Sequence, residues 1–133
     1  MIPPSMGVGR MLPVRDVVVI GGSARALQAV IDLIGALPGG LPASIALVIH
    51  TSPDTPGRLA TLLGRHGLRV DYAKDGESLQ HGRVYIAPAD QHLLAQDDGR
   101  LQLAHGPSEN GFRPAIDQLF RTAATTYGAR VVG

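Results

Sequence analysis

The feature that most constrains this chain is an apolar segment that runs into a helical pattern through two glycines and a serine. Residues 17–20 are three valines and an isoleucine without polar alternation, which is typical of a strand buried on both faces of a parallel sheet. Gly21, Gly22 and Ser23 follow, and the apolar spacing predicts an amphipathic helix over residues 24–36. A strand followed at once by a helix is the opening unit of an α/β sheet.

The rest of the chain continues this alternation. Further strands are predicted at 45–49, 69–72 and 83–86, a hairpin at 93–103, and a final strand from 129 to 133, with helices from 56 to about 65 and from 114 to 127. This order predicts the α/β class: a doubly wound, mostly parallel sheet with helices on both faces and a β-hairpin insertion.

Length and composition limit the class of protein. The 133 residues suit one domain, which we place at 16–133, with a flexible leader at 1–15 that holds three prolines. The net charge of +1 without a basic cluster gives no sign of a nucleic-acid partner. The absence of cysteine excludes disulfides and thiolate chemistry. Because no apolar run is long enough to span a membrane, we expect a cytoplasmic protein without membrane insertion.

Two polar residues follow predicted strands. Ser23 comes after the first strand and His50 directly after the second. Ligands of open α/β sheets bind in the crevice outside the carboxyl ends of the strands. A histidine there could take a proton from the serine, and the Ala24 N–H at the start of the helix could stabilise an oxyanion. The pattern therefore suggests part of a serine hydrolase site.

Other interpretations remain open at this point. Ser23 is also well placed to cap the following helix, and His50 could be an ordinary polar residue at a strand end. A dinucleotide site is disfavoured because the glycines do not form GxGxxG. His92 follows another predicted strand and is a further site candidate. No HxH or HExxH spacing occurs, so we expect no metal and no cofactor.

Several short segments, taken together in their order along the chain, resemble the motifs of a known protein family. They are Val-Val-Ile-Gly-Gly-Ser at 18–23, Ile-His at 49–50, Asp-Gly-Glu at 75–77 with Gly82, Tyr-Ile-Ala-Pro at 85–88 with His92, Arg-Pro-Ala-Ile-Asp at 113–117 with Leu-Phe at 119–120, and Tyr-Gly-Ala-Arg-Val-Val-Gly at 127–133. In this order and spacing the chain resembles the CheB-type protein-glutamate methylesterases of bacterial chemotaxis.

The resemblance implies a serine hydrolase. Such an enzyme hydrolyses glutamyl methyl esters on chemoreceptors to glutamate and methanol, and can deamidate receptor glutamines. The family's nucleophile falls on Ser23 and its histidine on His50. The implied partner is a methylated chemoreceptor, or another methylated signalling protein, as the substrate.

The chain departs from the family pattern in three respects. Arg25 and Ala26 stand where the family has glycines, which makes Arg25, with His92, a candidate substrate-site residue. The family's triad aspartate would lie beyond Gly133, so we expect a domain that is truncated at its C-terminus. The fifteen residues before the domain are too few for the receiver domain of chemotaxis members, so we expect none. The alternative function is therefore a catalytically inactive CheB-like interaction domain or a fragment without the triad aspartate.

Overall fold

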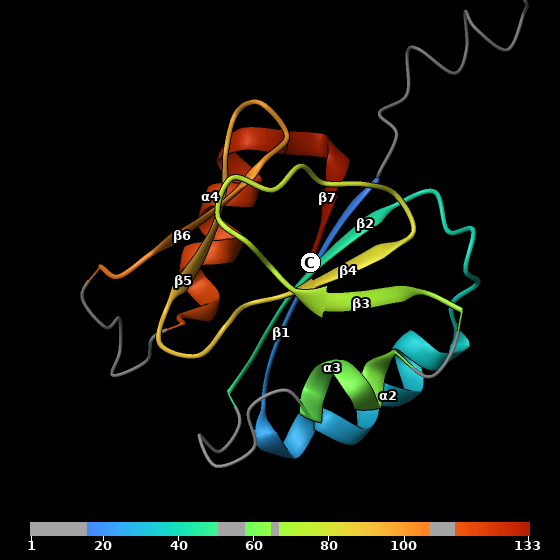
Figure 1. Ribbon diagram of the computed structural model, residues 1–133. Helices are drawn as coiled ribbons and strands as arrows, with labels where there is room; N and C mark the ends of the chain where they lie inside the picture. Colours follow the sequence, from blue (N-terminus) through green and yellow to red (C-terminus); the bar gives the residue numbers. More distant parts are fainter. Residues whose placement is uncertain (1–15, 51–57, 65–66, 107–113) are drawn as a thin grey trace, which may run out of the picture.

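The computed structural model describes residues 16–50, 58–64, 67–106 and 114–133, and the chain is traced in Figure 1. In these residues the main sheet has the strand order β3-β4-β2-β1-β7, with every neighbouring pair parallel. Its strands are β1 (Val17–Ser23), β2 (Ser44–His50), β3 (Arg69–Tyr72), β4 (Arg83–Ile86) and β7 (Val131–Val132). A separate antiparallel hairpin joins β5 (His92–Ala95) to β6 (Leu101–Ala104).

Helices cover both faces of this sheet, which confirms the predicted doubly wound class. They are α2 (Leu27–Ala36), α3 (Arg58–Leu63) and α4 (Ile116–Tyr127), with short 3-10 turns η1 (Ala24–Ala26) and η2 (Gly128–Arg130). Figure 1 shows α2 and α3 on one side of the sheet, and α4 with the hairpin on the other. The predicted hairpin insertion is thus also present.

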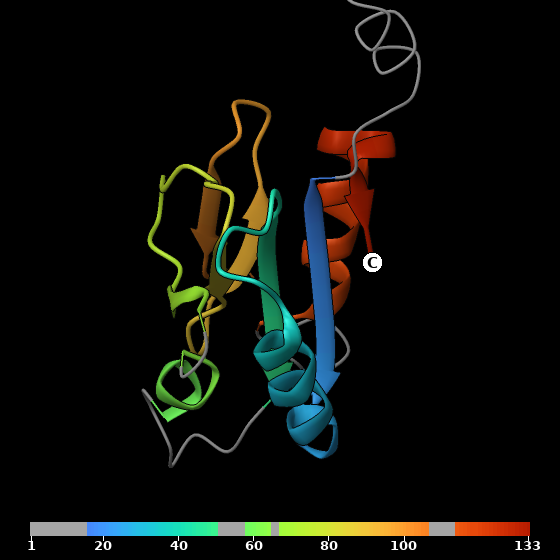
Figure 2. The ribbon, with the colours of Figure 1, turned by 90° about the vertical axis from the view of Figure 1, so that its right-hand side faces the viewer.

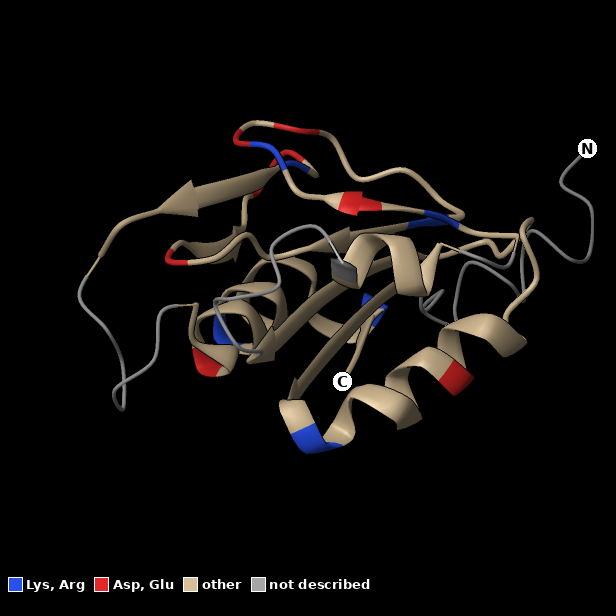
Figure 3. Cartoon of the chain, turned by 60° about the horizontal axis from the view of Figure 1, so that its bottom comes forward, with Lys and Arg blue, Asp and Glu red and all other residues tan. Residues whose placement is uncertain are grey.

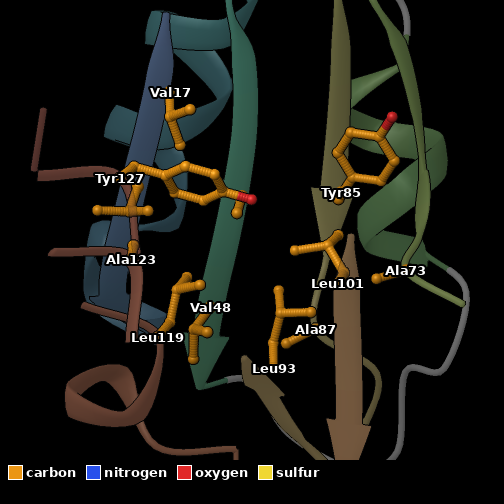
Figure 4. Packing of buried hydrophobic residues seen from close by; sticks show 12 residues of the cluster. Val17, Val48, Ala73, Tyr85, Ala87, Leu93, Leu101, Leu119, Ala123 and Tyr127 are labelled. Carbon is orange, nitrogen blue, oxygen red and sulfur yellow. The ribbon is translucent and has the colours of Figure 1, made fainter. Parts of the chain in front are cut away.

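Two apolar clusters hold these layers together. On the α2–α3 side, Ile34 and Leu63 pack with the β2 residue Leu47, and each of the three is at most 1% exposed. On the other side, Leu119 of α4 and Leu93 of the hairpin pack with Val48, as Figure 4 shows. Because β2 contributes to both clusters, it is buried along almost its whole length.

The predicted carboxyl end of β1 was wrong. The sequence predicted that this strand would stop before the glycines, but β1 continues through Gly22 to Ser23. Backbone pairing with β2 persists to its last residue, because the glycines remain in extended conformation and keep the register. Val18 and Ile20 are only half-buried, so β1 is less enclosed than β2. The predicted helix at 56–65 has its start and its end outside the described residues.

Gly21 allows the start of α4 to approach the sheet closely. A Cβ atom at this position would overlap the Ile116 side chain in the first turn of α4. The absence of a side chain at Gly21 therefore lets the start of α4 lie against the carboxyl end of β1. Figure 2 shows η1 and α2 starting directly below this same end of the strand.

An ion-pair cluster around Asp16 lies at the opposite end of the sheet. The Asp16 carboxylate accepts hydrogen bonds from Arg130 Nε and Nη2, both at 2.9 Å, and lies 3.1 Å from His81 Nε2. The Asp16 carbonyl also accepts the Ser44 N–H at 2.8 Å. The hydrogen bonds from Arg130 lower the pKa of the Asp16 carboxyl, although burial opposes this effect. The cluster thus connects β1, β2, η2 and the turn before β4.

None of the described helices is long and apolar enough to cross a membrane. Acidic and basic residues are interspersed over the described part of the chain (Figure 3). This mixed distribution agrees with the small net charge.

We expect Gly21→Ala to destabilise the fold. The added methyl must displace Ile116, and overpacking of this kind typically costs about 1–3 kcal/mol. Gly40→Ala is the matched control, because a Cβ there meets no atom within 4 Å. Urea unfolding monitored by circular dichroism checks both variants. Equal unfolding midpoints for the two variants would contradict the close contact at Gly21.

We expect Asp16→Asn to lower the free energy of unfolding by about 1 kcal/mol near neutral pH, a modest figure because Arg130 and His81 are both half exposed. The folded-state pKa of Asp16 lies below the unfolded value, so its contribution is present above the unfolded pKa and is lost as pH falls through the folded pKa. Unfolding measured at about pH 7 and about pH 3 should therefore show a difference between variant and wild type that shrinks in acid. A difference that is independent of pH would contradict this assignment.

Candidate functional site

The parallel pairing of β1 with β2 places Ser23 beside His50. The register runs without a break from Val17 opposite Ser44 to Ser23 opposite His50. Neighbouring strands in a sheet lie about 4.8 Å apart. The two residues that the sequence analysis singled out are thus direct neighbours at the carboxyl edge of the sheet.

Strand alternation puts both side chains on the same face. Val19 precedes Ser23 by four residues and Val48 precedes His50 by two, and both valines belong to the apolar cluster under α4. Side chains at even spacing along a strand point to one face. Ser23 and His50 therefore lie on the α4 side, just beyond the end of the apolar cluster.

Ser23 is exposed and does not cap the helix that follows it. Its backbone is extended, with φ −88° and ψ 174°, and its side chain makes no capping hydrogen bond to η1. The interpretation of Ser23 as a side-chain cap is therefore wrong. The hydroxyl lies at the surface, next to Ala24, which opens the first turn.

His50 is half-buried and is held by the start of α4. Its Nε2 atom lies 2.7 Å from the carbonyl oxygen of Pro114. Because a carbonyl oxygen only accepts hydrogen bonds, Nε2 carries the proton in this contact. The histidine is thus oriented by a backbone group that the close approach at Gly21 brings to the sheet edge.

His92 is in the interior, with an exposed fraction of 1%. Its Nδ1 atom accepts a hydrogen bond from the Ala115 N–H at 3.1 Å. The sequence analysis placed His92 at a strand end, and the structure places it at the first residue of β5, packed against the start of α4. A direct contact with substrate stays a prediction for this residue.

Arg25 is the remaining candidate from the sequence, and another histidine, His81, lies far from the Ser23–His50 pair. Arg25 is exposed in η1, two residues after Ser23, and its contact with substrate also stays a prediction. His81 belongs to the Asp16 cluster at the opposite end of the sheet. In the described part of the chain, no group of three His, Asp or Glu residues is arranged to hold a metal ion.

Sequence reasoning missed the role of the peptide between Pro114 and Ala115. Its two polar atoms contact His50 and His92, which the sequence analysis had considered separately. The sequence contains no signal for this, because the contact uses backbone atoms of an apolar dipeptide. The sequence predicted only that a helix begins near Pro114, and this says nothing of a contact with either histidine.

Comparisons of the chain with known proteins agree on one family. The family model described as "CheB methylesterase" matches residues 18–133. A protein-glutamate methylesterase/protein-glutamine glutaminase of Methanosarcina mazei is 35% identical over 127 residues, which covers 90% of this chain and 35% of that protein. The protein-glutamate methylesterase FrzG of Myxococcus xanthus is 37% identical over 122 residues, which covers 91% and 36%. The chain thus spans about a third of the length of these curated relatives.

A solved structure shares the fold. The crystal structure of the Thermotoga maritima CheB methylesterase catalytic domain superposes with a TM-score of 0.81 at 35% sequence identity. The match covers 87% of this chain and 64% of that one.

We expect Ser23→Ala to leave stability unchanged within about 0.5 kcal/mol, because the hydroxyl makes no cap, whereas loss of a capping hydroxyl costs about 1 kcal/mol. Thr122→Val is the matched control, since the Thr122 hydroxyl accepts the Ala95 N–H at 3.0 Å and should contribute about 1 kcal/mol. Chemical unfolding of both variants measures the two values. A clear loss of stability on Ser23→Ala would restore the cap interpretation.

Proposed function

The chain belongs to the CheB methylesterase family, and on this basis we propose that it is a serine hydrolase acting on glutamyl methyl esters of chemoreceptors. The products are glutamate and methanol, and glutamine deamidation is the second reaction of the same site. The catalytic groups belong to residues 16–133, with Ser23 as the nucleophile and His50 as the general base. The partner is the methylated receptor, or another methylated signalling protein, which binds as the substrate.

The observation that carries this proposal is the in-register pairing of Ser23 with His50. A serine hydroxyl is a weak nucleophile until a neighbouring base takes its proton, and imidazole is the usual base near neutral pH. The exposure of Ser23 also suits the substrate, because an ester carried on a protein surface reaches only an accessible nucleophile.

The reaction proceeds in two steps. Ser23 Oγ attacks the ester carbonyl while His50 takes the hydroxyl proton, and the Ala24 N–H helps to stabilise the oxyanion. His50 then returns the proton to the methoxy group, and methanol leaves from an acyl-serine. In the second step His50 takes a proton from water, and the resulting hydroxide attacks the carbonyl of the acyl-serine. His50 returns this proton to Ser23 Oγ as the acyl bond breaks, which releases glutamate and free Ser23.

One observation favours the second candidate, an inactive interaction domain. Arg25 is exposed in η1, two residues beyond Ser23. A guanidinium there suits binding of an acidic receptor segment. In this second function the domain binds receptor segments without hydrolysing them.

We expect the chain to release methanol from methylated receptor membranes, and Ser23→Ala to lower this rate by at least about a thousandfold. Ser78→Ala is the control, because Ser78 is also exposed but lies on the loop between β3 and β4. A fluorophosphonate probe, followed by mass spectrometry, should label Ser23 in the wild type and in the control.

The outcomes separate the two functions. Methanol release that persists in Ser23→Ala would remove this residue from the mechanism. Binding of receptor peptides without turnover or labelling, unaffected by Ser23→Ala and weakened by Arg25→Ala, would instead support the interaction domain.

A further inference from the structure

One peptide group lies between two histidines. The carbonyl oxygen of Pro114 lies 2.7 Å from His50 Nε2, and the N–H of Ala115 donates to His92 Nδ1 at 3.1 Å. These are the two polar ends of the same peptide unit. The peptide bond is planar, so whatever fixes the direction of its N–H also fixes the direction of its C=O.

The two contacts specify the protonation of both rings. The carbonyl requires a hydrogen on His50 Nε2, so the neutral ring has its lone pair on Nδ1. The amide N–H requires a lone pair on His92 Nδ1, so the neutral His92 ring carries its hydrogen on Nε2. Each histidine is therefore held as the same tautomer, through opposite ends of one peptide.

The part of this group formed by His92 and Ala115 is buried in the protein interior. His92 is 1% exposed and Ala115 is 3% exposed. The proline ring fixes φ at Pro114, and Ile116 packs into the space above Gly21. The peptide thus has little freedom to rotate, and the half-buried His50 ring is the outermost member of the group.

We propose that His92 is a positioning residue, which acts through the Pro114–Ala115 peptide to hold His50 in its Nε2–H tautomer and so leaves His50 Nδ1 as the basic atom. The structural part of this proposal concerns the ring tautomer alone. Its catalytic part, that Nδ1 takes the Ser23 proton, rests on the proposed function. In this arrangement a backbone carbonyl orients the base, the task that a carboxylate performs in a serine triad.

A purely structural role for His92 predicts something different. A buried residue that only caps the start of α4 would affect stability when replaced, but it would leave the His50 tautomer unchanged. The two roles are therefore separated by a measurement on the His50 ring itself.

Two variants in which an amide side chain replaces His92 make a matched pair for this measurement. In His92→Asn the side-chain oxygen takes the place of Nδ1 and still accepts the Ala115 N–H. In His92→Gln the polar group lies one bond further out, near the position of Nε2. Both variants keep a polar side chain in the same site, and only the first keeps the acceptor where the peptide needs it.

The test is long-range ¹H–¹⁵N correlation of the imidazole rings in the full chain, assigned with His50→Gln. We expect a single Nε2–H tautomer for His50 in the wild type and in His92→Asn, and a mixture of tautomers in His92→Gln. Methanol release should follow the same order, with kcat lowered about tenfold or more in His92→Gln and KM nearly unchanged, because the base is misplaced while the binding surface is kept.

Two results would overturn the proposal. One is an Nδ1–H tautomer of His50 in the wild type, which needs no variant to observe. The other is a folded His92→Gln whose His50 spectrum matches that of His92→Asn. If the His50 tautomers follow the expected order in the wild type and the two variants but the wild type releases no methanol, the proposed function fails and the positioning of His50 stands.

Discussion

The uninterrupted pairing of β1 with β2 is the constraint on which the rest of the site depends. Seven residues of each strand pair in register, and the last pair is Ser23 with His50. A shift of one residue would move one of the two side chains to the opposite face of the sheet. The apolar packing of β2 on both faces, for example through Leu47 and Val48, prevents this shift. Core packing therefore fixes the position of the two polar groups.

The two ends of the sheet carry different kinds of polar groups. At the amino end, Asp16 gathers Arg130 and His81 into one charged cluster that joins four segments of the chain. At the carboxyl end, β1 finishes in the exposed Ser23 and β2 in the half-buried His50. This division is common in open α/β sheets, where ligands bind at the carboxyl edge. Here the charged contacts that hold the fold lie away from the Ser23–His50 edge.

The start of α4 connects the core to that edge. Gly21 admits Ile116, and this contact brings the Pro114–Ala115 peptide to the two histidines. A buried polar group is stable only when it is hydrogen-bonded. No buried side-chain nitrogen or oxygen among the described residues lacks a partner. The same hydrogen bond that satisfies His92 therefore also aligns the peptide that faces His50.

The sequence by itself determined the class of fold and the two residues at the sheet edge. Runs such as 17–20 and 45–49 are apolar because parallel strands are buried on both faces, so the strands could be located, and with them the polar residues Ser23 and His50 that follow these runs. The motifs also indicated the family that the comparisons show. The extension of β1 to Ser23, the lack of a cap and the position of His92 were decided by the tertiary structure. The physical reason is that these features depend on backbone hydrogen bonds and on close packing between segments far apart in the chain, and neither leaves a mark on the local pattern of side chains.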